Sequence, residues 1–194
     1  MSSNTVQDYI IRVLPLSAED ISLLMSCATH REVKKGIAVL KEGEICRSFY
    51  LVEKGGLRTY YNKNGIPINL NFTFEGNFVA NLKSYKTGEP SDIIIEACED
   101  ASVWIFNIDL IRDQIDLFPE VSRFIKKLAL RLLLASEEYS KLYKILTPAE
   151  RYKYVEQNNP ILLQRISLSQ MASYLGVSRE TLSRIRGKNS DNRL

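Results

Sequence analysis

Three hydrophobic patterns follow one another along the chain. Behind an N-cap candidate at Ser17, apolar residues recur at steps of three and four up to Ala28, which predicts a short helix. Over residues 33–108, short runs of β-branched and aromatic residues alternate with glycine-containing breaks. One break is Asn64-Gly65, a dipeptide that suits a two-residue hairpin turn because both positions take positive φ. This spacing predicts an antiparallel β-roll, or double-stranded β-helix.

The third pattern predicts a long helix from Phe118 to Leu146. Its apolar positions are separated by alternating steps of three and four residues, an average repeat of about 3.5. The seam consists of Val121, Ile125, Leu128, Leu132, Ala135, Tyr139 and Leu142. A narrow, regular seam is typical of helices that pair with a second copy, so it predicts a homodimer. The alternative is a single amphipathic helix that packs on the roll of its own chain.

A compact helix start follows the long helix. Thr147 suits the N-cap, Pro148 the first helical position and Glu150 the third position of a capping box. This helix is expected to end before Pro160, and the apolar run ILLQRIS at 161–167 predicts a short strand. The chain therefore divides into a β-roll sensor domain at 1–117, a dimerisation helix at 118–146 and a helix-turn-helix domain at 147–194.

The stretch SLSQMASYLGVSRETLSRIRGK at 167–188 has the steric pattern of a helix-turn-helix. Ala172 lets the two helices approach closely, and Gly176 suits the positive φ of the turn between them. Leu182 lies on the inner face of the second helix. Gly187 is expected to end that helix, so most of a β-hairpin wing is expected to be lacking after it.

Charge is distributed unevenly between the two parts of the chain. Residues 1–146 hold 18 Lys and Arg against 19 Asp and Glu, whereas residues 147–194 hold 8 against 4. An exposed basic helix suits the DNA major groove, since arginine can bind guanine with two hydrogen bonds and glutamate can accept from cytosine. The residues predicted to contact DNA are Ser167, Gln170, Ser178, Arg179, Glu180, Thr181, Ser183, Arg184, Arg186 and Lys188. The alternative is a solvated helical hairpin or a surface for protein contacts.

The composition of the chain limits which other classes of function are expected. A chain of 194 residues, 45% of them hydrophobic, can bury one good core and a smaller second one. Cys27, Cys46 and Cys98 lack the spacing of a disulfide framework or metal site, which favours a reducing cytoplasm. Neither a signal peptide nor a membrane span is expected. The sequence contains no recognisable Ser/His/acid set, metal cluster or glycine-rich phosphate loop, so it does not suggest an enzyme.

Four stretches together resemble a bacterial family, the catabolite activator and fumarate-nitrate regulator (Crp/Fnr) family. They are VSRETLSRI at 177–185, LKEGE at 40–44, FYLVEKGGLRTYY at 49–61 and FEGNFVANL at 74–82. The resemblance implies an α+β fold with a cyclic-nucleotide-binding-type roll, a dimer through the long helix, and a transcription regulator that binds double-stranded DNA. RNA polymerase is a further candidate partner. The resemblance also implies that Arg179, Glu180 and Arg184 read bases.

The chain departs from this family where its cyclic AMP-binding members hold the ligand. Their Gly-Glu-Leu and Arg-Ser elements align with Ala80-Asn81-Leu82 and Ser91-Asp92 here, and no arginine occurs between Arg58 and Arg112. An acid beside the cyclic phosphate would leave its charge unpaired at a cost of several kcal/mol, so cyclic AMP binding is not expected.

Other sensing chemistries of the family also lack their residues. An iron-sulfur cluster needs four cysteines, and the single histidine, His30, is interpreted as an ordinary surface or roll residue rather than a haem ligand. No cofactor is therefore predicted. If an unidentified small molecule binds the roll, its pocket is expected to consist of Phe78, Ala80, Asn81, Leu82, Ser91 and Asp92 with Ala135 and Tyr139 of the facing helix.

Two functions remain open from the sequence. The first is a homodimeric regulator that binds a near-palindromic operator and does not respond to cyclic AMP. The second is a ligand-binding β-roll protein that acts through protein contacts rather than through DNA.

Overall fold

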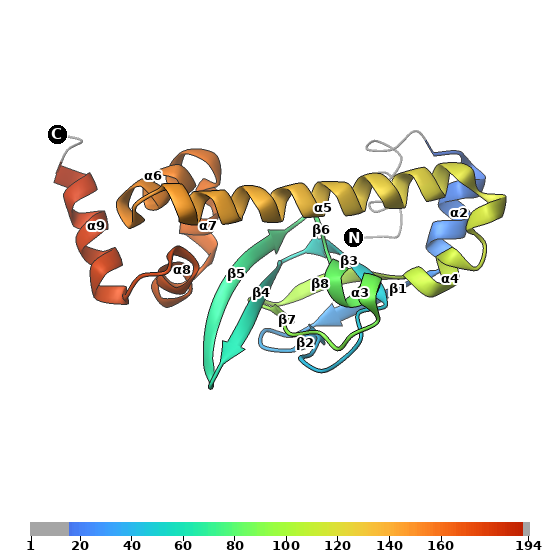
Figure 1. Cartoon of the computed structure of the whole chain (residues 1–194), viewed down its shortest axis with the longest axis horizontal. Coiled ribbons are helices and arrows are strands. Elements are labelled where there is room, and N and C mark those ends of the chain that lie inside the picture. Colours follow the sequence, from blue (N-terminus) through green and yellow to red (C-terminus); the bar gives the residue numbers. More distant parts are fainter. Residues whose placement is uncertain (1–15, 192–194) are drawn as a thin grey trace.

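The computed structural model describes residues 16–191, apart from the side chains of Glu138 and of residues 188–191. The predicted α+β fold with an antiparallel roll is confirmed: two four-stranded antiparallel sheets face each other below a long helix (Figure 1). The part of the predicted sensor domain before residue 16 lies outside the described residues.

Each sheet combines strands from distant parts of the chain. The first has the order β1 (Ala28–Val33), β8 (Ala101–Asn107), β3 (Ser48–Lys54) and β6 (Phe78–Val79). The second has the order β2 (Ala38–Leu40), β7 (Ile94–Ala97), β4 (Gly56–Lys63) and β5 (Ile66–Phe74). The predicted hairpin joins β4 to β5, with φ of 53° at Asn64 and 84° at Gly65. Val52, Leu57 and Ile95 are fully buried between the sheets.

The helices lie beside and beyond the roll. They are α2 (Ala18–Ser26), α3 (Leu82–Thr87), α4 (Ile108–Arg112), α5 (Pro119–Ile145), α6 (Pro148–Asn158), α7 (Pro160–Arg165), α8 (Leu168–Leu175) and α9 (Arg179–Asp191), with a short 3₁₀ turn at Ile115–Leu117. The predicted cap at Ser17 begins α2, and the predicted capping box of Thr147 and Glu150 begins α6. In Figure 1, α5 extends along the roll and carries α6 to α9 at its C-terminal end.

Two residues of the predicted α5 seam are buried within their own chain, and the dimer contact predicted for the other five stays a prediction. Val121 and Leu128 are buried with Leu24 of α2 and the roll, and Ile125 and Leu132 pack partly buried against the same cluster. The other predicted seam residues differ: Ala135 is exposed, whereas Tyr139 and Leu142 lie at the C-terminal helices. A 3.5-residue repeat indicates that one face of a helix is packed. It does not indicate whether the same chain or a second copy packs against that face.

A second row of α5 is exposed instead. Leu130, Leu133 and Leu134 keep 55%, 60% and 53% of their surface accessible. Leu133 and Leu134 lie three and four residues after Leu130, so the three side chains share one side of the helix. In the chain as described, this row leaves apolar surface uncovered.

Two further predictions were wrong in the C-terminal part. The segment predicted as a strand at 161–167 is mostly helical: α7 has Pro160 at its first position and buries Leu162. Gly187 does not end α9, which continues to Asp191. An interior glycine costs a helix only about 1 kcal/mol relative to alanine, and this cost alone does not stop it.

Candidate nucleic-acid interface and hinge

Helices α8 and α9 are joined by a short turn at Gly176 and are held by local contacts. Ser167 Oγ accepts from the Gln170 amide and Gln170 Oε1 accepts from the Ser167 amide, so α8 begins with the predicted capping box. Gly176 ends α8 with φ of 65°. Ala172 and Leu182 are buried between the helices and their supports, in the inner positions expected from the sequence.

The outer face of α9 carries the predicted base readers. Arg179, Glu180 and Arg184 are exposed, as are Ser183 and Arg186. Ser178 Oγ accepts from the Thr181 amide at 3.2 Å and so caps the helix, while Arg184 donates to Thr181 Oγ1 at 3.3 Å. Lys188 lies in α9, but its side chain falls outside the described residues.

Glu180 is held as an anion at the start of α9. Hydrogen bonding to its own backbone amide, together with Ser178, lowers the pKa of the Glu180 carboxyl below its ordinary value. An ionised carboxylate accepts hydrogen bonds and cannot donate them. The start of α9 thus offers arginine donors and one carboxylate acceptor side by side, the pair of chemistries that reads G·C pairs in the major groove.

The first helix, α8, is turned toward the roll. Ser173 Oγ accepts from the Asn69 amide at 3.0 Å and donates to the Pro67 carbonyl at 2.9 Å. Asn69 Nδ2 also donates to the Gln170 carbonyl at 3.2 Å. Ser167 and Gln170 form the capping box of α8. Their predicted contact with DNA stays a prediction.

A charged contact next to α8 joins the same two parts. Arg165 of α7 donates to both carboxylate oxygens of Glu75, at 2.5 and 2.8 Å, and also pairs with Glu99. Its guanidinium lies 4.2 Å from the centre of the Phe74 ring. Arg165 is the main cause that lowers the pKa of the Glu75 carboxyl. These contacts, with those of Ser173, are called the docking contact below.

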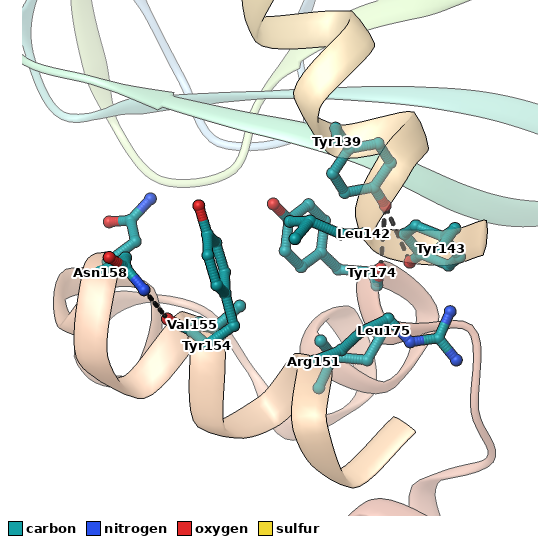
Figure 2. A pocket seen from close by; sticks show the side chains of 10 residues that line it. Tyr139, Leu142, Tyr143, Arg151, Tyr154, Val155, Asn158, Tyr174 and Leu175 are labelled. Carbon is teal, nitrogen blue, oxygen red and sulfur yellow. Dashed lines mark hydrogen bonds between the residues drawn. The ribbon is translucent and has the colours of Figure 1, made fainter. Parts of the chain in front are cut away.

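The C-terminal end of α5 meets α6 and α8 in a cluster of aromatic residues (Figure 2). Tyr139 Oη donates to the Tyr174 carbonyl at 2.9 Å and lies 2.8 Å from Tyr143 Oη. The Arg151 guanidinium lies 4.3 Å from the centre of the Tyr143 ring. Sequence reasoning placed Tyr139 in the seam and missed Arg151 and Tyr174. The spacing of Tyr139 and Tyr143 on one helix face was the available signal.

A cavity of about 190 Å³ opens within this cluster. Its walls come from α5, α6, α8 and the loop after α6, and they comprise Tyr139, Leu142, Tyr143, Arg151, Tyr154, Val155, Asn158, Asn159, Tyr174 and Leu175. This cavity is called the hinge pocket below, because Thr147 joins α5 to α6 beside it.

Asn81 and Ser91, which the sequence aligns with the ligand-binding elements of cyclic AMP-binding family members, hydrogen-bond to each other. Asn81 Nδ2 donates to Ser91 Oγ at 2.9 Å, and Ser91 Oγ donates to the Ile93 carbonyl at 2.7 Å. Asn81 Oδ1 also accepts from the Ser84 amide and caps α3. Both Asn81 and Ser91 are buried.

The effector pocket expected from the sequence does not form as a unit. Phe78, Ala80 and Leu82 pack against the core cluster below α5, and Asp92 pairs with Lys83 at 3.6 Å on the surface. Ala135 is exposed, and Tyr139 belongs to the hinge pocket. Ala135 and Tyr139 do not join the roll residues in one pocket, and their predicted role at an effector stays a prediction.

One grouping of chemically active residues was not expected. His30 Nε2 lies 2.9 Å from Glu53 Oε2 and 2.6 Å from Ser102 Oγ, and Ser102 donates to the same carboxylate oxygen at 2.8 Å. A proton relay needs serine and acid on opposite ring nitrogens, whereas here both contact Nε2. The grouping is therefore a structural hydrogen-bond cluster on the roll.

Metal centres and membrane spans are two further classes of feature to consider in residues 16–191. Within the side chains described there, no group of three or more His, Cys, Asp or Glu is placed to hold a metal ion. None of the helices in that range is both long and apolar enough to span a membrane.

Comparisons with known proteins agree with the fold. The family model described as "Cyclic nucleotide-binding domain" matches residues 30–116, and no curated protein matches the chain. FixK2 from Bradyrhizobium japonicum is 20% identical with a TM-score of 0.72, over 85% of this chain and 85% of that chain. The c-di-GMP-responsive regulator CLP from Xanthomonas campestris is 16% identical with a TM-score of 0.71, over 92% and 94%.

A third structure carries a family name. A Eubacterium rectale protein described as a transcriptional regulator of the Crp/Fnr family is 19% identical with a TM-score of 0.69, over 92% of this chain and 85% of that chain. Likeness at such low identity establishes a shared fold. The predicted resemblance to this group, in fold and in its cyclic-nucleotide-binding-type domain, is confirmed.

Proposed function

We propose that this chain, which has the fold of Crp/Fnr regulators and a cyclic-nucleotide-binding-type domain at 30–116, is a homodimeric, sequence-specific DNA-binding transcription regulator that acts in the cytoplasm. The observation that carries the proposal is the exposed face of α9, where Arg179, Glu180 and Arg184 lie together on the second of two helices joined by the turn at Gly176. RNA polymerase is a further candidate partner of such a regulator.

The chemistry of α9 supports base reading as well as phosphate contact. Arg179 and Arg184 present planar forks of donors that match O6 and N7 of guanine, while the ionised Glu180 accepts from cytosine N4. The start of α9 also offers amide groups at the positive end of a helix, which favours phosphate oxygens near Ser178. This division predicts that individual arginines on α9 contribute to sequence preference and not only to affinity.

The dimer is proposed through the exposed row of α5. Leu130, Leu133 and Leu134 leave apolar surface that a second copy of α5 covers in the same register on both sides of a two-fold axis. Two copies of α9 then reach successive major grooves of a near-palindromic site, about 34 Å apart. Figure 1 shows that α9 lies at one end of the molecule, beyond the roll.

The roll is proposed not to take cyclic AMP. Ser91 and Asp92 occupy the place of the arginine that neutralises the cyclic phosphate in binding members, and Asn81 is bonded to Ser91 rather than free for ribose. A bound phosphate would gain no cation at that position and would lie near the Asp92 carboxylate. The alternative function is that of a β-roll protein that acts only through protein contacts. None of the observations above favours it over DNA binding by α9.

Selection of bound duplexes from a random pool tests the DNA-binding proposal directly. We expect a near-palindromic consensus, and we expect Arg184→Ala to weaken binding to it by about 1–3 kcal/mol with relaxed preference at one base pair. Arg112→Ala is the matched control, because Arg112 is an exposed arginine on α4 at the other end of the molecule (Figure 1). Failure to enrich any duplex at low salt would rule out sequence-specific binding.

Sedimentation of charge variants tests the dimer. Leu133→Glu places two carboxylates, one from each copy, close together in the proposed interface. Because they repel each other, we expect monomers at micromolar concentration. Leu117→Glu is the control, because Leu117 is 79% exposed in the 3₁₀ turn before α5. A dimer that survives Leu133→Glu would move the interface to another face of the chain.

A further inference from the structure

The hinge pocket has the size of a small aromatic molecule. Its volume of about 190 Å³ exceeds that of an engineered protein cavity of about 150 Å³ known to hold benzene. Ligand sites are concave, mostly apolar and equipped with a few convergent polar groups. The hinge pocket fits this description, since Leu142, Val155 and Leu175 line it beside four tyrosines and one arginine.

The walls favour a flat ring over an aliphatic chain. Tyr154 of α6 and Tyr174 of α8 both line the pocket, and Figure 2 shows their rings in the same part of it with the hydroxyl groups pointing the same way. Aromatic rings contact one another in offset or edge-on arrangements, and such contacts contribute free energy beyond the area that they bury. A single-ring ligand fits the available space.

The pocket also has unused capacity to bind an anion. Arg151 Nε is buried and has no hydrogen-bond acceptor among the described residues. A buried donor without an acceptor is costly, and a carboxylate that accepts from a guanidinium forms one of the stronger hydrogen bonds in proteins. In Figure 2, Arg151 lies with Tyr143 on one side of the pocket and Tyr154 with Asn158 on the other, so a ring and a carboxylate can occupy different ends.

The tyrosines do not oppose an anion there. Burial is the main cause that raises the pKa of Tyr139, Tyr143 and Tyr174 above the ordinary value of a phenol. These hydroxyl groups are therefore neutral at neutral pH. The positive charge of Arg151 is left to attract a negative ligand.

We propose that the hinge pocket binds a single-ring aromatic carboxylate, with its ring against Tyr154 and Tyr174 and its carboxylate on Arg151. This site is separate from the roll position at Asn81 and Ser91, where related domains hold cyclic nucleotides. Its walls come from both sides of Thr147, so a ligand that touches α5 as well as α6 and α8 stabilises this one arrangement of the helix-turn-helix.

The turn of the helix-turn-helix also rests on the same cluster. A Cβ atom at Gly176 would lie 3.0 Å from the Tyr143 ring and 3.9 Å from an Arg151 nitrogen. A ligand that fixes Tyr143 and Arg151 therefore acts on side chains that lie close to the turn before α9. Any consequence for DNA binding rests on the proposed function, whereas ligand binding itself does not.

Isothermal titration of the full chain with benzoate, 4-hydroxybenzoate and phenylacetate tests the site. We expect saturable binding of at least one of them, and affinity lower by roughly tenfold or more for benzyl alcohol, which keeps the ring and lacks the charge. Arg151→Gln should weaken the carboxylate by a similar factor. Lys153→Gln is the matched control on α6, because it removes an equal charge from an exposed residue outside the pocket, and it should change affinity less than about twofold.

A second variant keeps the test decisive if Arg151→Gln fails to fold. Leu142→Trp adds an indole to the pocket wall from a half-buried position and should abolish binding while circular dichroism stays unchanged. Absence of binding by all three carboxylates at 10-fold-spaced concentrations up to about 10 mM would overturn the proposal, since such an affinity is weaker than about −3 kcal/mol. Unchanged binding by both variants would overturn it as well.

The same titration separates this proposal from the regulator proposal. Gel shifts on selected DNA, with and without the carboxylate, form the second arm. Carboxylate binding without any DNA binding would remove the regulator and leave the pocket. DNA binding without carboxylate binding would remove the pocket and leave the regulator.

Discussion

The roll and the hinge treat their buried polar groups in opposite ways. At the roll position that corresponds to a cyclic nucleotide site, Asn81 and Ser91 hydrogen-bond to each other and to the nearby backbone. At the hinge, Arg151 Nε is buried without an acceptor and borders a cavity of about 190 Å³. The fold therefore does not fix where a chain keeps its capacity to bind a ligand. That capacity depends on which polar groups are already paired inside the chain.

The largest expected difference between the roll and the hinge is the cost of replacing a glycine that ends a helix. Gly176 and Gly88 both end a helix in the left-handed region, with φ of 65° and 71°. A Cβ at Gly176 meets Tyr143 at 3.0 Å, whereas at Gly88 nothing lies within 4 Å. We expect Gly176→Ala to cost about 2–4 kcal/mol in free energy of unfolding, from backbone strain plus crowding, and Gly88→Ala about 1 kcal/mol.

Urea unfolding of both variants measures this difference. Equal costs would mean that Tyr143 moves aside freely, and the hinge would then be loose rather than packed. Gly176→Ala combined with Tyr143→Leu is the check on mechanism, because removal of the ring should return the cost to that of Gly88→Ala if crowding is responsible.

The glycine at 176 also shows what the sequence could and could not predict. The helix-turn-helix was predictable because its signals are local: a cap at Ser167, a small residue at Ala172 and a glycine at the turn. The roll was predictable from the spacing of strands and from the Asn64-Gly65 hairpin. Helix α7 was missed because a short apolar run fits a strand or a helix equally well, although Pro160 suits a first helical position.

The hinge pocket and the partner of α5 could not be predicted in the same way. The pocket joins Tyr139, Arg151 and Tyr174, which are far apart in sequence and meet only when α6 and α8 fold back on α5. The repeat along α5 identified an apolar stripe, and the chain itself buries Val121 and Leu128 of that stripe, which the repeat alone does not reveal. Sequence patterns show that a face is buried, and tertiary structure decides what buries it.

Removal of polar side chains tests the central contrast. Asn81→Ala should cost about 1–3 kcal/mol, because it removes the cap of α3 and leaves the Ser84 amide and Ser91 hydroxyl with fewer partners. Arg151→Gln should cost less than about 1 kcal/mol, because the Nε donor that it removes was already unpaired.

Thermal and urea unfolding measure both variants under one set of conditions. If Arg151→Gln is the more costly change, its stacking on Tyr143 outweighs the unpaired donor. In that event the hinge is a packed structural cluster, and the contrast with the roll is lost.

The docking contact joins the two regions and should have a smaller effect. Arg165 pairs with Glu75 and Glu99, all of them partly exposed, so Arg165→Gln should cost about 1 kcal/mol. We expect trypsin to cleave the hinge near Lys144 up to about fivefold faster, because the C-terminal helices separate from the roll more often. Arg47→Gln is the control, since the Arg47–Asp109 pair lies within the roll domain.

Acid should weaken the docking contact in the same direction. The pKa of Glu75 is lowered by Arg165, so the contact stabilises the docked state above the ordinary glutamate pKa. This stabilisation is lost as pH falls through the lowered value. Faster cleavage of the wild type at acid pH by a protease that is active there, with no further change in Arg165→Gln, would identify this pair as the cause.

The smallest expected effect is that of cyclic AMP on the melting temperature of the wild-type chain. This measurement tests directly whether the roll or the hinge binds a ligand. A ligand present at 100 times its dissociation constant stabilises a protein by about 2.7 kcal/mol, which a thermal melt resolves easily. We expect no shift with millimolar cyclic AMP, because Asn81 and Ser91 are bonded to each other and Asp92 repels the phosphate. Under the same conditions an aromatic carboxylate should raise the melting temperature, and only when Arg151 is present. A shift with cyclic AMP would mean that the hydrogen bonds of Asn81 open at little cost, and the roll would then be a ligand site despite its paired side chains.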